Sequence, residues 1–233
     1  MRKKLAVTSV LMSVALLLGT TSVFAATTST GNSQATITFT TDKAPVIVDP
    51  DDPTKPYDPI KDGAITPTNQ TGPLTLDYAP NFNFGSHEAL ATNSAVYQAL
   101  NKKPFLQVTD RRALRSKWDM KVKLGKFINS ETSNESLSGA KLSISSGIVK
   151  SAIGLTDGSA PTTQNVQLTA GAASGTTILS SAAGTFSTWV VYWPGDLVGQ
   201  APNTYISLDV PINTQVKGTH TATLEWTISD VVN

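Results

Sequence analysis

Apolar and polar residues alternate along most of the chain from residue 74 onward. The alternation is clearest in five short segments, at residues 74–76, 106–108, 142–144, 166–168 and 206–210. Because side chains i and i+2 lie on the same face of a strand, each segment is expected to bury one face and expose the other. Asn, Gly, Ser and Pro clusters separate the segments, and only residues 87–101 give a weak helical pattern. We predict an all-β fold, an antiparallel β-sandwich of Ig-like or Greek-key type, with a proline-rich N-terminal extension.

Two further alternating segments each carry a tryptophan. In the first, Trp118 and Met120 share a face with Val122 and Leu124, and the opposite face is polar and largely basic; in the second, Trp226 shares a face with Leu224 and Ile228. Alternating apolar residues usually mark the buried face of an antiparallel strand. Both tryptophans are therefore interpreted first as core residues, and a direct contact with a ligand is the alternative.

A third aromatic segment ends the long uncharged stretch 158–195. Trp189 and Trp193 would share one face of a strand, with Val190 and Tyr192 on the other. Apolar residues on both faces are typical of a central strand. The alternative is that Trp193 and Tyr192 lie near a rim, where an aromatic ring can stack on a sugar.

The first 70 residues have a different composition. Residues 1–25 have the basic start, the short apolar run and the small-residue cleavage site of a secretory signal peptide. Residues 26–70 are rich in Thr and Ser and then in Pro and Asp, apart from a short alternating stretch at 36–40, and they predict a flexible tail. The β domain is expected over residues 71–233. No second apolar run of spanning length follows, so we expect the mature chain to leave the membrane.

Charge and cysteine content narrow the function classes. Without Arg2, Lys3 and Lys4 of the signal, 15 Lys and Arg remain against 17 Asp and Glu, which gives a nucleic-acid role little support. The chain has no cysteine, so its stability must come from a core rather than from disulfides.

Half of all Lys and Arg residues lie between Lys102 and Lys126. The candidates for binding a phosphate polymer or an acidic partner are Arg111, Arg112, Arg115, Lys117, Lys121 and Lys123. The alternative is a solvated edge whose lysines prevent aggregation.

Three motifs together resemble the WxL domain of Gram-positive surface proteins. They are Leu-Asp-Tyr-Ala-Pro-Asn-Phe-Asn-Phe-Gly at 76–85, Trp118-Asp119-Met120, and Trp226-Thr227-Ile228 near the end. Neither tryptophan motif ends in leucine, but methionine and isoleucine are apolar and of similar size. The resemblance covers nearly the whole mature chain.

The resemblance implies a secreted protein of the bacterial cell surface, attached non-covalently to peptidoglycan. It also implies assembly with a membrane-anchored WxL-interacting protein and other WxL proteins. Teichoic acids are a further expected contact. The alternative function is a secreted adhesin or carbohydrate-binding module for a host or plant ligand.

Enzymatic activity is the least supported function. The chain has two histidines, His87 and His220, and no P-loop or Gly-x-Ser-x-Gly motif. A glycoside hydrolase needs only two carboxylates, which acids such as Asp110 and Asp119 could supply, so it stays a third alternative, although the acids of this chain are scattered. We expect no catalysis, no metal and no cofactor.

Overall fold

The computed structural model describes residues 33–62, 66–155, 160–195 and 201–231. The predicted signal peptide lies outside these ranges. Met1–Thr38 and Phe39–Asn233 form two separate units, and the second contains every strand and the single short 3₁₀-helix η1 (Pro59–Asp62) found in the described ranges. No helix in these ranges is long and apolar enough to cross a membrane.

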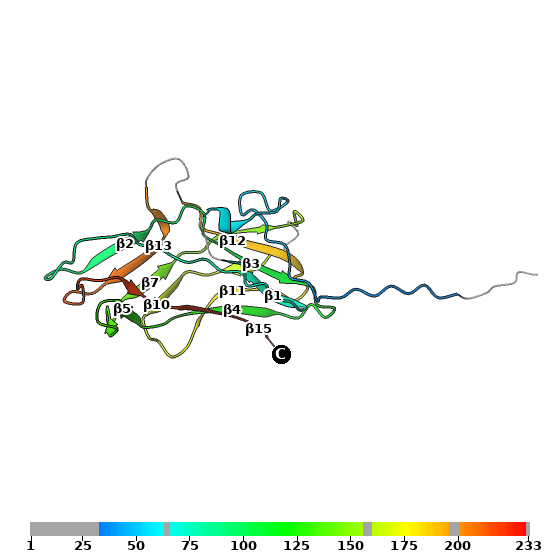
Figure 1. Cartoon of the computed structure of the whole chain (residues 1–233). Coiled ribbons are helices and arrows are strands. Elements are labelled where there is room, and N and C mark those ends of the chain that lie inside the picture. The colour runs from blue at the N-terminus through cyan, green and yellow to red at the C-terminus, as the bar shows by residue number, and fades with distance from the viewer. Residues whose placement is uncertain (1–32, 63–65, 156–159, 196–200, 232–233) are drawn as a thin grey trace, which may run out of the picture. The chain divides into compact units, whose positions relative to one another are not determined.

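All strand pairs in the second unit are antiparallel (Figure 1). The strands are β1 (Leu74–Tyr78), β2 (Ala95–Ala99), β3 (Phe105–Asp110), β4 (Trp118–Leu124), β5 (Phe127–Asn129), β6 (Glu135–Ser136), β7 (Lys141–Ile144), β8 (Ile148–Ser151), β9 (Thr162–Thr163), β10 (Val166–Thr169), β11 (Thr176–Ser180), β12 (Ser187–Tyr192), β13 (Asn203–Val210), β14 (His220–Thr221) and β15 (Leu224–Asp230). The predicted all-β antiparallel class is therefore confirmed.

Within the described ranges, the strands form three four-stranded sheets and one three-stranded sheet. Their orders are β1-β3-β12-β8, β10-β7-β13-β2, β15-β4-β11-β9 and β14-β5-β6. One core cluster joins the three larger sheets, because it contains Leu106 of β3, Trp118 of β4 and Leu208 of β13. The core thus lies between sheets whose inner faces carry the alternating apolar residues.

The weak helical pattern at residues 87–101 was misleading. The second half of that range forms β2, whose Tyr97 pairs with Leu208 of β13. Val96 and Tyr97 have β-branched and aromatic side chains, which fit a pleated, half-buried surface. Pairing with β13 therefore outweighs the helix propensity of the neighbouring alanines.

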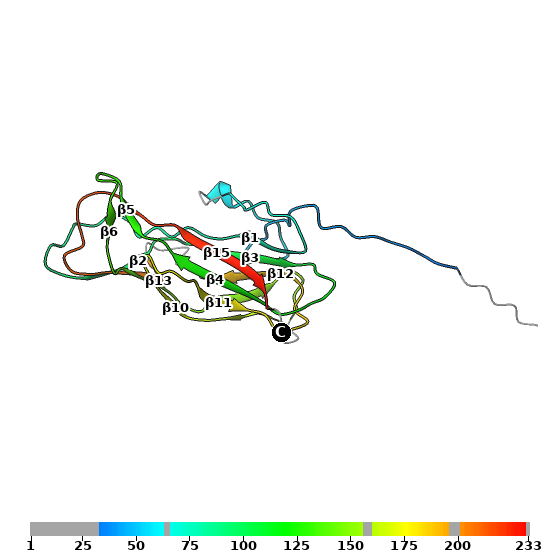
Figure 2. The ribbon, with the colours of Figure 1, turned by 90° about the horizontal axis from the view of Figure 1, so that it is seen from below.

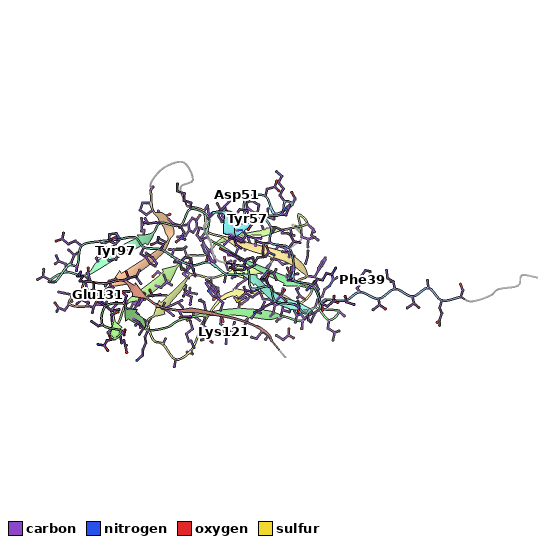
Figure 3. All side chains as sticks on the ribbon, in the orientation of Figure 1. Phe39, Asp51, Tyr57, Tyr97, Lys121 and Glu131 are labelled. Carbon is purple, nitrogen blue, oxygen red and sulfur yellow. The ribbon has the colours of Figure 1, made fainter. Side chains whose placement is uncertain are left out.

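Residues 46–57 lie on the sheet β1-β3-β12-β8, although the sequence placed them in a flexible tail. Ile47 is only 7% exposed and joins a second apolar cluster with Phe105 and Tyr192. Gln107 of β3 fixes the segment, because its Oε1 accepts a 2.9 Å hydrogen bond from Val48 N and its Nε2 donates to Val46 O at 3.0 Å. We call residues 46–57 the strap; Figure 3 labels Asp51 and Tyr57 on it.

The strap covers apolar side chains on the outer face of this sheet. Val190 and Tyr192 of β12 point away from Trp189 and Val191, so both faces of β12 need cover. Lys103 adds ion pairs to Asp49 and Asp51 at 3.0 and 2.8 Å. Burial lowers the pKa of Lys103, but its hydrogen bonds to these carboxylates outweigh that effect and raise it.

A buried carboxylate lies next to the strap. Asp77 of β1 is 2% exposed and accepts hydrogen bonds from Thr75, Gln107 and Thr109. Burial raises the pKa of Asp77 above its usual value, against the lowering effect of these three donors. Asp77 and Gln107 thus join the strap to the sheet through one polar network.

Candidate functional site

The two tryptophan motifs lie side by side on neighbouring strands. Figure 2 shows β15 next to β4, and the register pairs Asp230 with Trp118, Ile228 with Met120, and Trp226 with Val122. Paired residues in an antiparallel sheet direct their side chains to the same face. The apolar residues of both motifs therefore face the same core, although they are far apart in the sequence.

The two motifs differ in burial. Trp118 is 0% exposed, because β4 is a central strand between β15 and β11. Trp226 is only half-buried and packs against the core from β15, which is an edge strand. The predicted core role is thus met fully by Trp118, whereas Trp226 also offers surface.

A cleft of about 840 Å³ opens beside Trp226. Residues 79–89 form one wall, and residues 215–216 and 218–224 together with Trp226 form the other. Its floor consists of buried apolar side chains, from Leu124, Phe127, Leu137, Leu142, Leu208 and Val210. The segment with the Asn-Phe-Asn-Phe motif and the terminal tryptophan motif therefore line one cavity.

Half-buried aromatic rings surround this cleft. They belong to Phe82 and Phe84 of the first wall, Tyr97 of β2, and Trp226. His87 stacks on Tyr97 with ring centroids 4.1 Å apart, and its Nε2 lies 2.6 Å from Phe84 O. Aromatic rings with one face open can hold a sugar or another flat apolar group.

Polar contacts hold the first wall in place. Asn83 N donates to Asn101 Oδ1 at 2.8 Å, and Leu100 N donates to Asn83 O at 2.7 Å. Gly85 has φ +84°, and a side chain there would meet Leu100 at 2.9 Å, so this turn needs a glycine. Asn83 and Gly85 thus fix the backbone of the wall from which Phe82 and Phe84 line the cleft.

A family comparison decides what kind of protein carries these motifs. The model of the WxL domain surface cell wall-binding family matches residues 26–231. The chain belongs to this family. It is therefore a cell-surface protein that binds the cell wall, and the resemblance noted from the three motifs is confirmed. A search of curated proteins finds no match.

The six predicted basic residues of this WxL domain do not form one patch. Arg111 and Arg112 are partly buried and bind groups of the protein itself. Lys123 pairs with Glu225 at 2.6 Å. Arg115, Lys117 and Lys121 are exposed and have no ion pair with any residue in the described ranges, so the anion-binding prediction is reduced to these three.

Arg112 instead joins two strands. Its guanidinium contacts Asp110 at 2.7 Å and also pairs with Asp230 at the end of β15. Ser116 provides two further acceptors. Asp110 is 1% exposed, so Arg112 supplies the positive charge that a buried carboxylate requires. Arg112 is therefore a structural residue.

The sugar-stacking role predicted for Trp193 and Tyr192 does not fit the structure. Trp193 is 0% exposed, and its Nε1 donates to Ser145 O at 2.7 Å. Tyr192 is covered by the strap, and burial raises its pKa. Neither ring has an open face, and the central-strand interpretation of β12 is the correct one.

Sequence reasoning missed the cleft itself. In the sequence, Phe82 and Phe84 alternate with Asn81 and Asn83 like one face of an ordinary strand, and Tyr97 falls in the weak helical pattern. Within the described ranges, no three His, Cys, Asp or Glu residues are grouped as metal ligands. The local signal that could have indicated the site is the pair of aromatics flanked by asparagines before Gly85.

Proposed function

We propose that this WxL domain is a non-catalytic module that holds peptidoglycan non-covalently in the cleft beside Trp226. The observation that carries the proposal is the convergence of two family motifs, at 76–85 and 226–228, on one partly open aromatic cavity. The alternative wall contacts have less support, because Trp193 is buried and half of the basic candidates bind the protein's own groups.

The chemistry of the cleft fits a largely uncharged ligand. Phe82, Phe84 and Trp226 offer ring faces, while Asn81 and Asn83 offer amide groups that hydrogen-bond to hydroxyl and peptide groups. Sugar rings joined to short peptides present both kinds of group. The apolar floor would take up methyl groups of such a ligand.

The acids along the cleft support a binding role rather than hydrolysis. Glu88 is the one carboxylate among the described lining residues. Glycoside hydrolysis ordinarily uses two carboxyl groups that flank the scissile bond. A second acid at a suitable separation is therefore missing from the described part of the cleft.

We further propose that the domain acts within a surface complex, with a membrane-anchored WxL-interacting protein and other WxL proteins as partners. Family membership is the support for this proposal. A sandwich arrangement of the Ig-like or Greek-key type also stays a prediction; the shared core of three sheets supports it.

The test is co-sedimentation of the purified mature protein with cell walls, before and after removal of teichoic acids. We expect binding to survive removal, and Phe84→Ala to weaken it by about tenfold, or roughly 1.4 kcal/mol. Leu114→Ala is the matched control, because Leu114 is exposed and does not line the cleft. Equal binding of the two variants would refute the cleft as the site. Recovery of the wild type in the supernatant would favour the adhesin alternative.

A further inference from the structure

The outer edge of β15 has free backbone groups at every second residue. Gly125 N donates to Thr223 O at 2.8 Å, and Val231 N donates to Lys117 O at 3.0 Å. Because hydrogen-bonded pairs alternate along an antiparallel ladder, the odd-numbered residues of β15 bond to β4. The N–H and C=O groups of Leu224, Trp226 and Ile228 therefore point away from β4.

Nothing in the described ranges pairs with this edge. No hydrogen bond reaches the outward backbone groups of Trp226 or Ile228. The nearby edge strand β1 differs, because Thr68 donates from its N–H and its hydroxyl to carbonyls of β1. β15 also lacks Pro and Lys, which commonly protect sheet edges. The edge is thus a template for one more strand.

The side chains of β15 specify what that strand should look like. Leu224, Trp226 and Ile228 present a half-buried apolar row on one face, and Trp226 lies in the cleft. Glu225, Thr227 and Ser229 lie on the other face. An added strand should therefore have large apolar residues at alternate positions and small polar residues between them.

An exposed segment of this kind in the described part of the chain is Thr36-Ile37-Thr38-Phe39-Thr40. Ile37 is 76% exposed and Phe39 is 84% exposed, and neither belongs to a strand. Residues 26–41 carry no charge, so the segment would meet no like-charge repulsion at the edge. Two large apolar side chains left in water are a driving force for such pairing.

We propose that residues 36–40 of a second copy of this protein add to the free edge of β15 as an antiparallel strand. Ile37 and Phe39 then lie beside the apolar row of Trp226 and Ile228. The threonines of the segment lie beside Thr227 on the opposite face. This self-association goes beyond wall binding and uses backbone groups that the cleft proposal does not need.

A second copy is favoured over the chain's own segment by the position of Thr41. Thr41 O accepts from Gly72 N at 2.9 Å, and Arg111 donates to Gly72 O. The adjacent Arg112 binds Asp230, so Thr41 is held near the C-terminal end of β15. A segment that turned back from there would run parallel to β15, and parallel pairing is slightly weaker per residue. A second copy can supply the segment in the antiparallel direction.

The first test uses a fluorescent peptide of residues 33–41 with the full mature chain, followed by anisotropy. In the proposed pairing, Ile37 and Phe39 face Trp226 and Ile228 and exchange hydrogen bonds with them. N-methylation of Ile37 and Phe39 should weaken binding by at least about tenfold, or roughly 1.4 kcal/mol. N-methylation of Thr36 and Thr38 should leave it nearly unchanged. Equal affinity of the two peptides, or no binding of the unmodified one, would overturn the proposal.

The second test is sedimentation velocity of the full mature chain over a range of concentrations. The wild type should show a concentration-dependent increase in sedimentation coefficient. The double variant Ile37→Gln with Phe39→Gln should lose it, and Thr36→Gln with Thr38→Gln should keep it. Both pairs lie in an exposed segment, so folding is preserved. If the wild type sediments as a monomer at every concentration, the proposal of a second copy is overturned. This holds also if the chain's own segment occupies the edge, because that arrangement gives a monomer too.

Discussion

The inner and terminal tryptophan motifs have the same alternating pattern, lie on neighbouring strands and face the same core, yet their environments differ. Trp118 has a strand on both sides and is fully buried. Trp226 has β4 on one side only and remains half-exposed at the cleft. The position of a strand in its sheet, rather than the residues on it, therefore decides whether the tryptophan is a core residue or a surface available to a ligand.

The largest expected effect on stability is that of removing the side chain of Trp118. Trp118→Ala should lower the free energy of unfolding by about 4 kcal/mol, because it leaves a large cavity in a close-packed core. Trp118→Phe should cost less, about 1–2 kcal/mol, since it keeps an aromatic ring. The indole N–H that it removes meets no acceptor in the described ranges. Urea unfolding measures both, and a loss under about 1 kcal/mol for Trp118→Ala would contradict the burial.

The next largest effect is expected for Arg112, which links the end of β3 to the end of β15. Arg112→Ala should cost about 3 kcal/mol, because it leaves the carboxylate of Asp110 buried without its partner and frees Asp230. Lys123→Ala is the control. Its ion pair with Glu225 is exposed, so the expected loss is under about 1 kcal/mol. Equal losses in urea unfolding would show that Arg112 has no special structural role.

Removing the side chain of Trp226 should lower the stability less than removing that of Trp118. Trp226→Ala is expected to cost about 2 kcal/mol, because part of the ring is already in water. The same variant should lose wall binding in the sedimentation assay, which a purely structural residue would not do while the protein stays folded. A loss as large as that of Trp118→Ala would break the contrast between the motifs.

The smallest effect should come from the exposed lysines on the polar side of β4 and just before it. The double variant Lys117→Gln with Lys121→Gln should reduce wall binding less than about threefold at low ionic strength. The difference should vanish near physiological salt, where exposed charges are screened within about 8 Å. Binding measured at two salt concentrations checks this. A large loss that persisted in salt would move the wall site from the cleft to these lysines, one of which is labelled in Figure 3.

Much of the fold could be predicted from local alternation. The segments at 74–76, 106–108, 142–144, 166–168 and 206–210 all lie within strands. The last three bury one face and expose the other, as expected for period-two alternation, whereas β1 and β3 are buried on both faces, so the expectation of an exposed polar face was wrong for these two strands. The central position of β12 also followed from apolar residues on both of its faces. The three motifs predicted the family, since their order along the chain is distinctive.

The site could not be predicted in the same way. Whether Trp226 is buried depends on the neighbour that β15 lacks, and the order of strands is not encoded in any single segment. Lys123 appeared to be a free cation because its partner, Glu225, lies on a strand far along the chain. Arg112 also has a distant partner, Asp230, besides its neighbour Asp110. The cleft likewise forms from segments that meet only after the sheets have paired.

The strap gives the domain a defined mechanical connection to its N-terminal segment. Lys150 donates to the carbonyls of Pro50 and Asp51 at 2.8 and 2.9 Å, and Gln107 bonds to the backbone on both sides of Ile47. Tension applied through the N-terminal segment would first reach the hydrogen bonds that Gly72 and Arg111 donate to Thr41 O and Lys43 O, and then the Gln107 and Lys150 contacts, before it reached the strand ladders. On a cell surface exposed to flow, these contacts would yield first and leave the tryptophan-bearing sheet intact.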